Sequence, residues 1–367
     1  MGDGLGIPRS ADDITPAWLT GALRADGVLR DGEVVSVTSE TLSQGVGFLG
    51  QVLRLEPVYG GDATGAPSTI IAKIPTLDPG GRQIAAMYGM YERELQFYRH
   101  MAADMTMRVP RCYYGDGDPG AVAYILLLED LAPTGTLGDQ VVGCRLPEAR
   151  VALKRLAEHH AKWWQHPALE TTPWLGVGVD LVRGSIEQAY APSVEPFLHL
   201  FGDSFSPDVR AVIPTLGGAT LRMLESFDDG PFTIAHGDYR ADNMFFGHPG
   251  SDYDVAVIDW QSPNKGWAAY DLSYFICGSF ATNLRKQHEA VLRDEYFAAL
   301  SAAGVTGYNR QRFDDDYARS LLAYLALFVI NGATLDPSND RGRELFRAIF
   351  ERLDGALADA NSLSYLG

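Results

Sequence analysis

The sequence HGDYRADN at residues 236–243 and the sequence VAVIDW at residues 255–260 decide the fold. The second stretch is an apolar strand pattern that ends near Asp259, and the first places Asn243 five positions after Asp238. Phosphoryl transfer needs a carboxylate that orients the attacking hydroxyl, and it needs oxygen ligands that hold Mg²⁺ against the phosphates. Asp238, Asn243 and Asp259 supply groups of both kinds.

The spacing from Asp238 to Asn243 equals that of the His-Arg-Asp-x-x-x-x-Asn pattern of protein kinases, with Gly237 in place of the arginine. A polar turn in which the aspartates only cap backbone groups would give the same octet. Two patterns closer to the N-terminus favour the catalytic interpretation.

The first of these patterns is GVGFLGQV at residues 45–52, in which Gly45, Gly47 and Gly50 match Gly-x-Gly-x-x-Gly-x-Val. Glycine lets backbone N–H groups approach phosphate closely. A plain hairpin turn fits the pattern on its own. Because the segment leads into a strand pattern and opens no helix, it differs from a dinucleotide-binding fingerprint.

The second pattern is IIAKI at residues 70–74, an apolar strand that carries Lys73. It resembles Val-Ala-Ile-Lys, and a cation here suits the α- and β-phosphates, although a strand lysine also snorkels to solvent at a sheet edge. The helical pattern of residues 87–101 offers Glu92 and Glu94 as partners for the lysine. These two point in different directions, and either could be a solvated helix charge.

The chain is expected to form two lobes. Strand patterns at 33–41, 51–57, 68–75 and 122–128 predict an antiparallel sheet, whereas helical patterns dominate beyond Pro133. We predict a nucleotide-binding lobe at 1–128, a hinge at 129–133 and a catalytic and substrate-binding lobe at 134–367.

Within the larger lobe, the prolines and glycines of residues 174–218 predict short helical pieces that shape a cleft. Adenine is expected at the hinge, held by the carbonyl of Glu129 and the N–H of Leu131.

Together these residues resemble the aminoglycoside phosphotransferase and choline kinase group of the protein-kinase-like fold, over roughly residues 40–280. LEDL at 128–131, DWQ at 259–261 and DLSYF at 271–275 look most like its ecdysteroid kinase-like branch. The resemblance implies an α+β, bilobal protein-kinase-like fold, with a small antiparallel-sheet N-lobe and a larger, mainly helical C-lobe. It also implies ATP or GTP and Mg²⁺ as cofactors.

The same resemblance implies a role for each matching residue. Asp238 would orient or deprotonate the acceptor, Asn243 and Asp259 would bind Mg²⁺, Lys73 would bind phosphate, Glu94 rather than Glu92 would position Lys73, and Asp271 would brace the catalytic loop. Arg240 would either offset γ-phosphate charge or pair locally with Asp242.

Three departures from the protein-kinase motifs limit the class of substrate. Asp259-Trp260-Gln261 replaces Asp-Phe-Gly, no Ala-Pro-Glu follows, and only 12 positions separate Asp259 from Asp271. An ordinary activation segment has no room there, so a protein substrate is disfavoured. We expect transfer of the γ-phosphoryl group to a small hydroxylated molecule; the alternative is a catalytically inactive nucleotide-binding scaffold.

The acceptor remains open between two classes. An aminoglycoside or choline-like cation would call for inward carboxylates, whereas a steroid-like or other apolar alcohol would call for an aromatic and aliphatic cleft. Tyr274, Phe275 and the aromatic C-terminal helices favour the second class.

Composition excludes some partners. The formal charge of −17 argues against nucleic acid, because phosphate backbones need a concentrated basic surface. The same acidity would attract a cationic substrate or serve only solubility. The chain shows no signal-peptide pattern, no apolar run of about twenty residues and no Cys-x-x-Cys pair. We therefore expect a cytoplasmic protein without a membrane span, disulfide framework, zinc site or obligate protein partner.

Two conspicuous clusters are assigned no function. His159-His160, with Trp163-Trp164, lies in a helical pattern and is expected to be core. Asp314-Asp315-Asp316 is expected to be a solvated helix start.

Overall fold

The computed structural model describes residues 5–42, 50–336 and 338–366. The chain divides into two compact units. The N-terminal unit is Met1–Gly135 together with Val257–Ser262, and the C-terminal unit is Thr136–Ala256 together with Pro263–Gly367. Residues 257–262, which the sequence analysis assigned to the C-terminal lobe, thus cluster with the N-terminal unit.

The N-terminal unit is built on a five-stranded antiparallel sheet with the order β1-β2-β3-β5-β4. The strands are β1 (Glu33–Thr41), β2 (Gly50–Gly60), β3 (Ile70–Pro75), β4 (Cys112–Asp118) and β5 (Ala123–Glu129). The predicted antiparallel sheet is confirmed. The edge strand β4 had no counterpart in the prediction, because its last four residues are glycine and aspartate, which are rare in strands.

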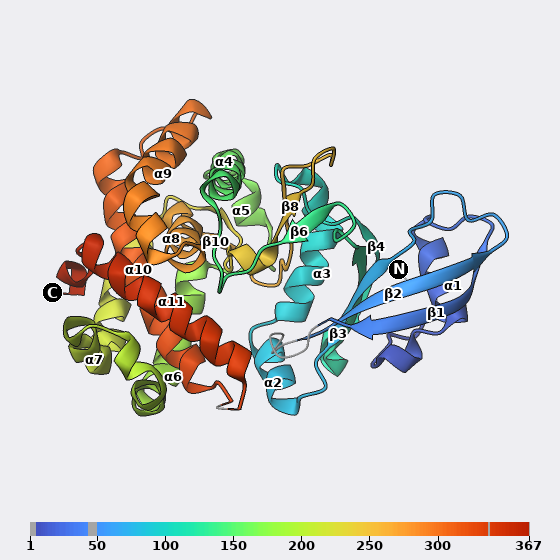
Figure 1. The fold of residues 1–367 in the computed structure, drawn as a ribbon, viewed down its shortest axis with the longest axis horizontal. Helices are drawn as coiled ribbons and strands as arrows, with labels where there is room; N and C mark the ends of the chain where they lie inside the picture. Colours follow the sequence, from blue (N-terminus) through green and yellow to red (C-terminus); the bar gives the residue numbers. More distant parts are fainter. Residues whose placement is uncertain (1–4, 43–49, 337, 367) are drawn as a thin grey trace. The chain divides into compact units, whose positions relative to one another are not determined.

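Strand alternation separates two faces of this sheet. Ile70, Ala72 and Ile74 of β3 share one apolar core with Leu19 and Leu23 of α1 (Pro16–Ala25). Lys73 lies between these residues in sequence, so its side chain projects from the opposite face. Figure 1 shows α1 and α3 (Met90–His100) on opposite sides of the sheet, and α2 (Pro79–Met87) precedes α3.

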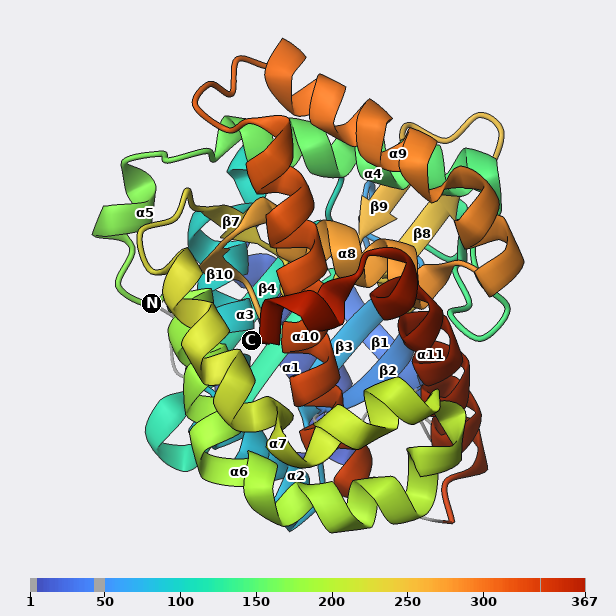
Figure 2. The same ribbon diagram turned by 90° about the vertical axis from the view of Figure 1, so that its left-hand side faces the viewer.

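The C-terminal unit is mainly helical, as predicted. Its helices are α4 (Leu146–Lys162), α5 (Ala168–Thr171), α6 (Gly178–Phe201), α7 (Pro207–Leu224), α8 (Ala268–Ser279), α9 (Thr282–Ala302), α10 (Arg310–Ala333) and α11 (Asp340–Asp359). All 12 residues of α8 are buried, and α10 runs through the middle of the helices (Figure 2). A helix buried on every side is the core element of its domain.

Short strands in this unit hold the loops that carry polar residues. They are β6 (Gly135–Leu137), β7 (Thr233–Ala235), β8 (Met244–Gly247), β9 (Val255–Val257) and β10 (Asn264–Gly266). β6, β8 and β9 form one sheet, and β7 pairs with β10 in another. The 236–243 loop therefore begins at the end of β7 and ends at the start of β8.

The prediction of short helical pieces between residues 174 and 218 was wrong. The region contains the long helices α6 and α7, with Pro192 and Pro196 inside the first and Pro214 inside the second. An interior proline removes one backbone hydrogen bond and weakens a helix. Burial of apolar side chains such as Phe197 outweighs that loss, because helices in proteins are stabilised mostly by tertiary packing.

None of the helices in the described ranges has an apolar stretch long enough to cross a membrane.

The pH dependence of stability is expected to report the burial of His159 in α4. Burial lowers the pKa of His159 to about 3, from an ordinary value near 6.5. Between pH 6.5 and about pH 3, His159 is protonated in the unfolded chain but neutral in the folded chain, so stability falls as the pH falls through this range. Between pH 7 and pH 5 the cost is about 2 kcal/mol. The free energy of unfolding is measured in urea at pH 7 and at pH 5. Its decrease between the two pH values should be about 2 kcal/mol smaller for His159→Gln than for the wild type.

His100→Gln is the matched control, because His100 is exposed. That variant should keep the wild-type loss on acidification. An equal loss in His159→Gln and the wild type would contradict the assignment.

Candidate active site

The N-terminal unit contains a buried charge cluster, which we call the lysine cluster: Lys73, Glu94 and Asp259. Lys73 Nζ lies 2.6 Å from Glu94 Oε1 and 2.7 Å from Asp259 Oδ1. Lys73 comes from β3, Glu94 from α3, and Asp259 from the segment after β9. The lysine therefore pairs with Glu94, as the resemblance implied, while Glu92 is exposed.

Burial and opposite charges compete within this cluster. Burial disfavours a charged lysine, but the carboxylates of Asp259 and Glu94 outweigh it and raise the pKa of Lys73 well above its usual value. Burial also raises the pKa of Glu94, and the Lys73 ammonium only partly offsets that shift. When both carboxylates are ionised, the cluster contains one cation and two anions. Its net charge is then negative, which favours binding of a further cation.

Asp259 is held in an unusual backbone conformation. Its φ of 65° lies in the left-handed region, which costs a non-glycine residue about 1–3 kcal/mol. The next residue, Trp260, is fully buried and stacks on Phe97 of α3, with ring centroids 4.3 Å apart. The Trp260 indole N–H donates to the carbonyl of Val257 at 3.1 Å. Trp260 thus fixes the segment to α3, the helix that also carries Glu94.

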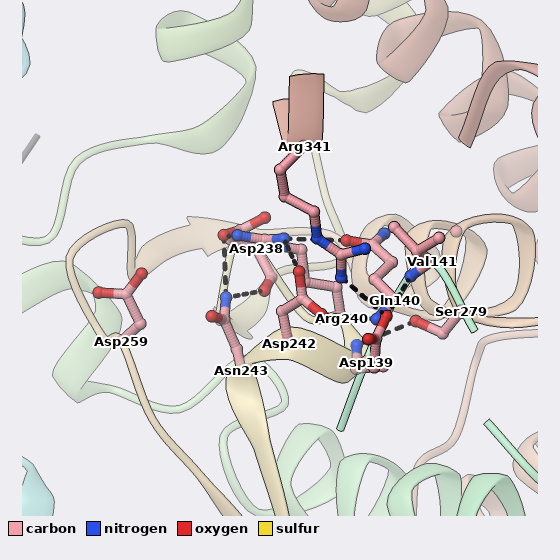
Figure 3. Close-up of polar contacts among 12 residues, drawn as sticks. Asp139, Gln140, Val141, Asp238, Arg240, Asp242, Asn243, Asp259, Ser279 and Arg341 are labelled. Atoms are coloured by element: carbon pink, nitrogen blue, oxygen red, sulfur yellow. Dashed lines mark hydrogen bonds and ion pairs between the residues drawn. The ribbon is translucent and has the colours of Figure 1, made fainter. Parts of the chain in front are cut away.

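The C-terminal unit contains the second group of predicted residues, in the 236–243 loop. Asn243 Nδ2 donates to the backbone carbonyl and to Oδ2 of Asp238, each at 2.9 Å. Arg240 Nε donates to the same Asp238 Oδ2 at 3.0 Å (Figure 3). With its amide nitrogen so engaged, Asn243 has its Oδ1 oxygen available as a cation ligand.

A buried carboxylate braces this loop. Asp271, at the start of α8, accepts the backbone N–H of His236 at 2.6 Å and that of Gly237 at 3.0 Å. Burial alone would raise the pKa of Asp271, but the hydrogen bond from His160 and the backbone donors keep it below its usual value. The role implied for Asp271 matches this geometry.

His160 contributes to the bracing in a way that the sequence did not indicate. Both His159 and His160 are fully buried, as expected of core residues. His160 also lies between two polar groups: its Nε2 is 3.3 Å from Asp271 Oδ2 and its Nδ1 is 2.6 Å from the hydroxyl of Tyr296 in α9. A histidine inside an apolar helical pattern was the only signal in the sequence.

Arg240 pairs with Asp238 and Asp242 together, so the local pairing that the sequence left open is present. Arg240 Nη1 donates to Asp242 Oδ2 at 3.0 Å and to Gln140 Oε1 at 2.9 Å. Gln140 N in turn donates to Asp242 Oδ1 at 2.6 Å. In Figure 3 these bonds join the 236–243 loop to residues 139–141, where Asp139 pairs with Arg341 of α11.

The other predicted site residues are the three glycines, Glu129 and Leu131. Gly45 and Gly47 lie outside the described residues, and Gly50 is the first residue of β2, opposite Pro75. The Glu129 side chain accepts two hydrogen bonds from Arg108 at 2.7 Å, and Leu131 is buried. Adenine binding at Glu129 and Leu131 stays a prediction.

The chemistry of the predicted metal ligands fits Mg²⁺. Across the part of the chain that the structure describes, no three His, Cys, Asp or Glu residues gather as a metal site. Asn243 and Asp259 offer an amide oxygen and a carboxylate, and Mg²⁺ is usually held by one or two such groups together with phosphates and water. Each of the two residues therefore offers an oxygen of the kind that Mg²⁺ prefers, and their role as metal ligands stays a prediction.

Comparison with known proteins identifies the family. The model of the ecdysteroid kinase-like family matches residues 44–304. The chain belongs to the ecdysteroid kinase-like family. The matched residues include Lys73, Glu94, Asp238, Asn243 and Asp259. A search of curated proteins found no significant match in sequence.

Solved structures share the fold of this ecdysteroid kinase-like protein. A candidate aminoglycoside phosphotransferase from Ralstonia eutropha JMP134 is 18% identical, with a TM-score of 0.51 over 93% of this chain and 97% of that one. A microcompartment-associated aminopropanol kinase is 16% identical, with a TM-score of 0.51 over 95% and 98%. Aminoglycoside 2′-phosphotransferase-IIIa, in its GDP complex, is 14% identical, with a TM-score of 0.50 over 89% and 94%. The predicted protein-kinase-like fold is confirmed.

Asp271→Asn tests the bracing of the 236–243 loop. The amide retains one neutral acceptor oxygen, so both backbone N–H groups lose a charged partner and one of them loses its acceptor. We expect a loss of about 2–3 kcal/mol in the free energy of unfolding, measured in urea. We also expect faster hydrogen exchange at the amides of His236 and Gly237.

Asp229→Asn is the control, because Asp229 is exposed in the same unit. Unchanged exchange at His236 and Gly237 in Asp271→Asn would show that Asp271 does not brace the loop.

Proposed function

We propose that this protein is a kinase that transfers the γ-phosphoryl group of ATP or GTP to a hydroxyl of a small molecule. The observation that carries the proposal is the buried Lys73 cation between Glu94 and Asp259. A buried ion pair adds little net stability, because desolvation offsets its Coulombic gain. A chain that has such a pair, and that also carries Asp238 and Asn243 in a separate loop, is therefore better explained by phosphate chemistry.

In the proposed reaction Asp238 is the catalytic residue. Its carboxylate orients the acceptor hydroxyl and takes its proton as the hydroxyl oxygen attacks the γ-phosphorus. The bond between that phosphorus and the β,γ-bridging oxygen breaks, and the nucleoside diphosphate leaves. Asn243 and Arg240 fix the rotamer of Asp238 before the acceptor arrives, which reduces the reorganisation needed in the transition state.

The remaining residues bind and neutralise the nucleotide. Lys73 donates from Nζ to the phosphates, and Glu94 keeps the ammonium charged and directed. Asn243 and Asp259 would hold Mg²⁺, which when bound neutralises phosphate charge. The glycines at 45, 47 and 50 are proposed to approach the phosphates through their backbone N–H groups.

The surroundings of Asp238 within the C-terminal unit support an acceptor with an apolar body. Burial, followed by the charge of Asp238, raises the pKa of Tyr274 well above its usual value, so the phenol lies near that carboxylate. The Tyr274 ring stacks on Tyr324 at 4.4 Å, and Tyr324 stacks on Tyr270 at 4.2 Å. Phe275, the other aromatic residue predicted here, is fully buried against Tyr239 and therefore adds no exposed apolar surface.

Asp238→Asn tests the chemistry with little change of shape. Nucleoside diphosphate release in the presence of Mg²⁺ is measured over a panel of cationic and apolar alcohols. We expect at least one alcohol to stimulate the wild type, and we expect Asp238→Asn to lower that stimulated rate by about 100-fold or more. Nucleotide affinity should stay within about twofold, because Asp238 acts on the acceptor.

The control for this variant is Asp208→Asn, since Asp208 is exposed on α7. Stimulated turnover that survives Asp238→Asn would refute the role of Asp238. Nucleotide binding by the wild type without stimulation by any alcohol would favour the inactive scaffold.

Glu94→Gln tests the lysine cluster. The amide keeps the shape of the side chain but removes the charge that orients Lys73, so the phosphates meet a less constrained cation. We expect ADP affinity, measured by titration calorimetry with Mg²⁺, to fall about tenfold, which corresponds to about 1.4 kcal/mol. Glu33→Gln, an exposed change in the same unit, should leave the affinity unaltered. Equal affinities of Glu94→Gln and the wild type would exclude this role.

A further inference from the structure

A cavity in the N-terminal unit lies on α3, outside the lysine cluster. It has a volume of about 150 Å³ and is bounded by α2, α3 and the turn Pro119–Ala121 that joins β4 to β5. Its lining includes Ala86, Tyr91, Glu92, Leu95, Val122 and Tyr124. All of them belong to one compact unit.

The body of the cavity is apolar and fits one ring. Tyr91 of α3 and Tyr124 of β5 stack on each other, with centroids 4.4 Å apart and planes 13° apart. Leu95 and Val122 add aliphatic surface to this aromatic pair. A cavity of about 150 Å³ is large enough for a benzene-sized molecule.

The rim of the cavity carries net negative charge. Glu92 lies in the first turn of α3, is exposed and pairs with no cation among residues 5–42, 50–336 and 338–366. Asp118 is also exposed and accepts the backbone N–H of Gly120 at 2.9 Å. Arg99 is the cation on the rim, and it is paired with Asp116 at 3.3 Å. An arriving ligand therefore meets uncompensated carboxylate charge, which attracts a cation.

We propose that this cavity binds a compact aromatic ammonium compound, with its ring against Tyr91 and Tyr124 and its ammonium group near Glu92. The tyrosine rings that line the cavity give the ligand apolar contact, and the carboxylates supply the charge complement. A neutral ring of the same size would lose the ionic contact, and an anionic ring would be repelled.

The same two tyrosines connect the cavity to the lysine cluster. The Tyr91 hydroxyl accepts the backbone N–H of Thr76 at 3.2 Å, and Thr76 directly follows β3, the strand of Lys73. Burial raises the pKa of the Tyr124 phenol well above its usual value, and the charges of Lys73 and Glu94 act on the same group. A ligand that contacts these rings is therefore expected to shift β3 and α3, the strand and the helix that carry Lys73 and Glu94.

Occupancy of the cavity should alter nucleotide affinity by about fivefold, a usual size for coupling between two sites. This coupling rests on the proposed function, because it assumes that Lys73 binds phosphate. Binding of the ammonium compound does not rest on it. By linkage, the nucleotide should change the affinity of the cavity ligand by the same factor.

The test compares three ring compounds that differ in charge and carry no alcohol: benzylammonium, benzamide and benzoate. Saturation-transfer NMR titrations on the full chain measure each affinity. We expect benzylammonium to bind with a Kd on the order of 1 mM, a value usual for so small a ligand, at least about tenfold tighter than benzamide. Benzoate should bind more weakly than benzamide.

Two variants locate the binding. Glu92→Gln should abolish the preference for benzylammonium over benzamide, and Ala86→Phe, at an exposed position that lines the cavity, should weaken both. Glu56→Gln, an exposed change on β2, should do neither. Equal affinities for the three compounds, or binding insensitive to Glu92→Gln and Ala86→Phe, would overturn the site.

ADP titrations with and without saturating benzylammonium separate the two proposals. A fivefold change in ADP affinity in the wild type, absent in Glu92→Gln, supports the coupling. An ADP affinity that is the same with and without benzylammonium would overturn the coupling. Failure of ADP to bind at all, while benzylammonium binding persists, would refute the proposed kinase and leave the cavity site standing.

Discussion

The constraint on which the rest of the structure depends is the burial of the Lys73 ammonium. A buried cation is tolerated only with paired charges and hydrogen bonds, and here Glu94 and Asp259 supply them. These partners come from a helix and from a segment 186 residues away in the chain. The pairing therefore ties β3, α3 and residues 257–262 into one unit, and the stacking of Trp260 on Phe97 keeps the third of these in place.

A second buried charge organises the C-terminal unit in the same manner. Asp271 is fully buried on α8, and its partners are two backbone N–H groups and His160. Helix α8, which is itself buried at every position, thereby fixes the conformation of the 236–243 loop. Lys73 in one unit and Asp271 in the other are thus buried charges whose partners come from distant parts of the chain.

Exposure distinguishes two pairs of carboxylates. The side chains of Glu94 and Asp271 are 1% and 0% exposed, whereas those of Asp259 and Asp238 are 23% and 24% exposed. The more exposed pair are the carboxylates to which the family resemblance assigns metal binding and catalysis. This division is what a preorganised site requires, because a group that binds ligand must be accessible while its orientation is fixed by groups that are not.

The sequence by itself determined the fold class, the family and the set of residues proposed to carry the chemistry, because motif spacing and strand and helix periodicity are local properties of the chain. It did not predict the helices α6 and α7, where packing of residues such as Phe197 outweighs interior prolines. It indicated that His160 is buried, but not that it bonds to Asp271 and Tyr296. The placement of Asp259 beside Lys73 and the cavity at Tyr91 and Tyr124 were decided only by tertiary structure. Contacts between residues far apart in sequence depend on how whole elements pack, and no local pattern encodes that.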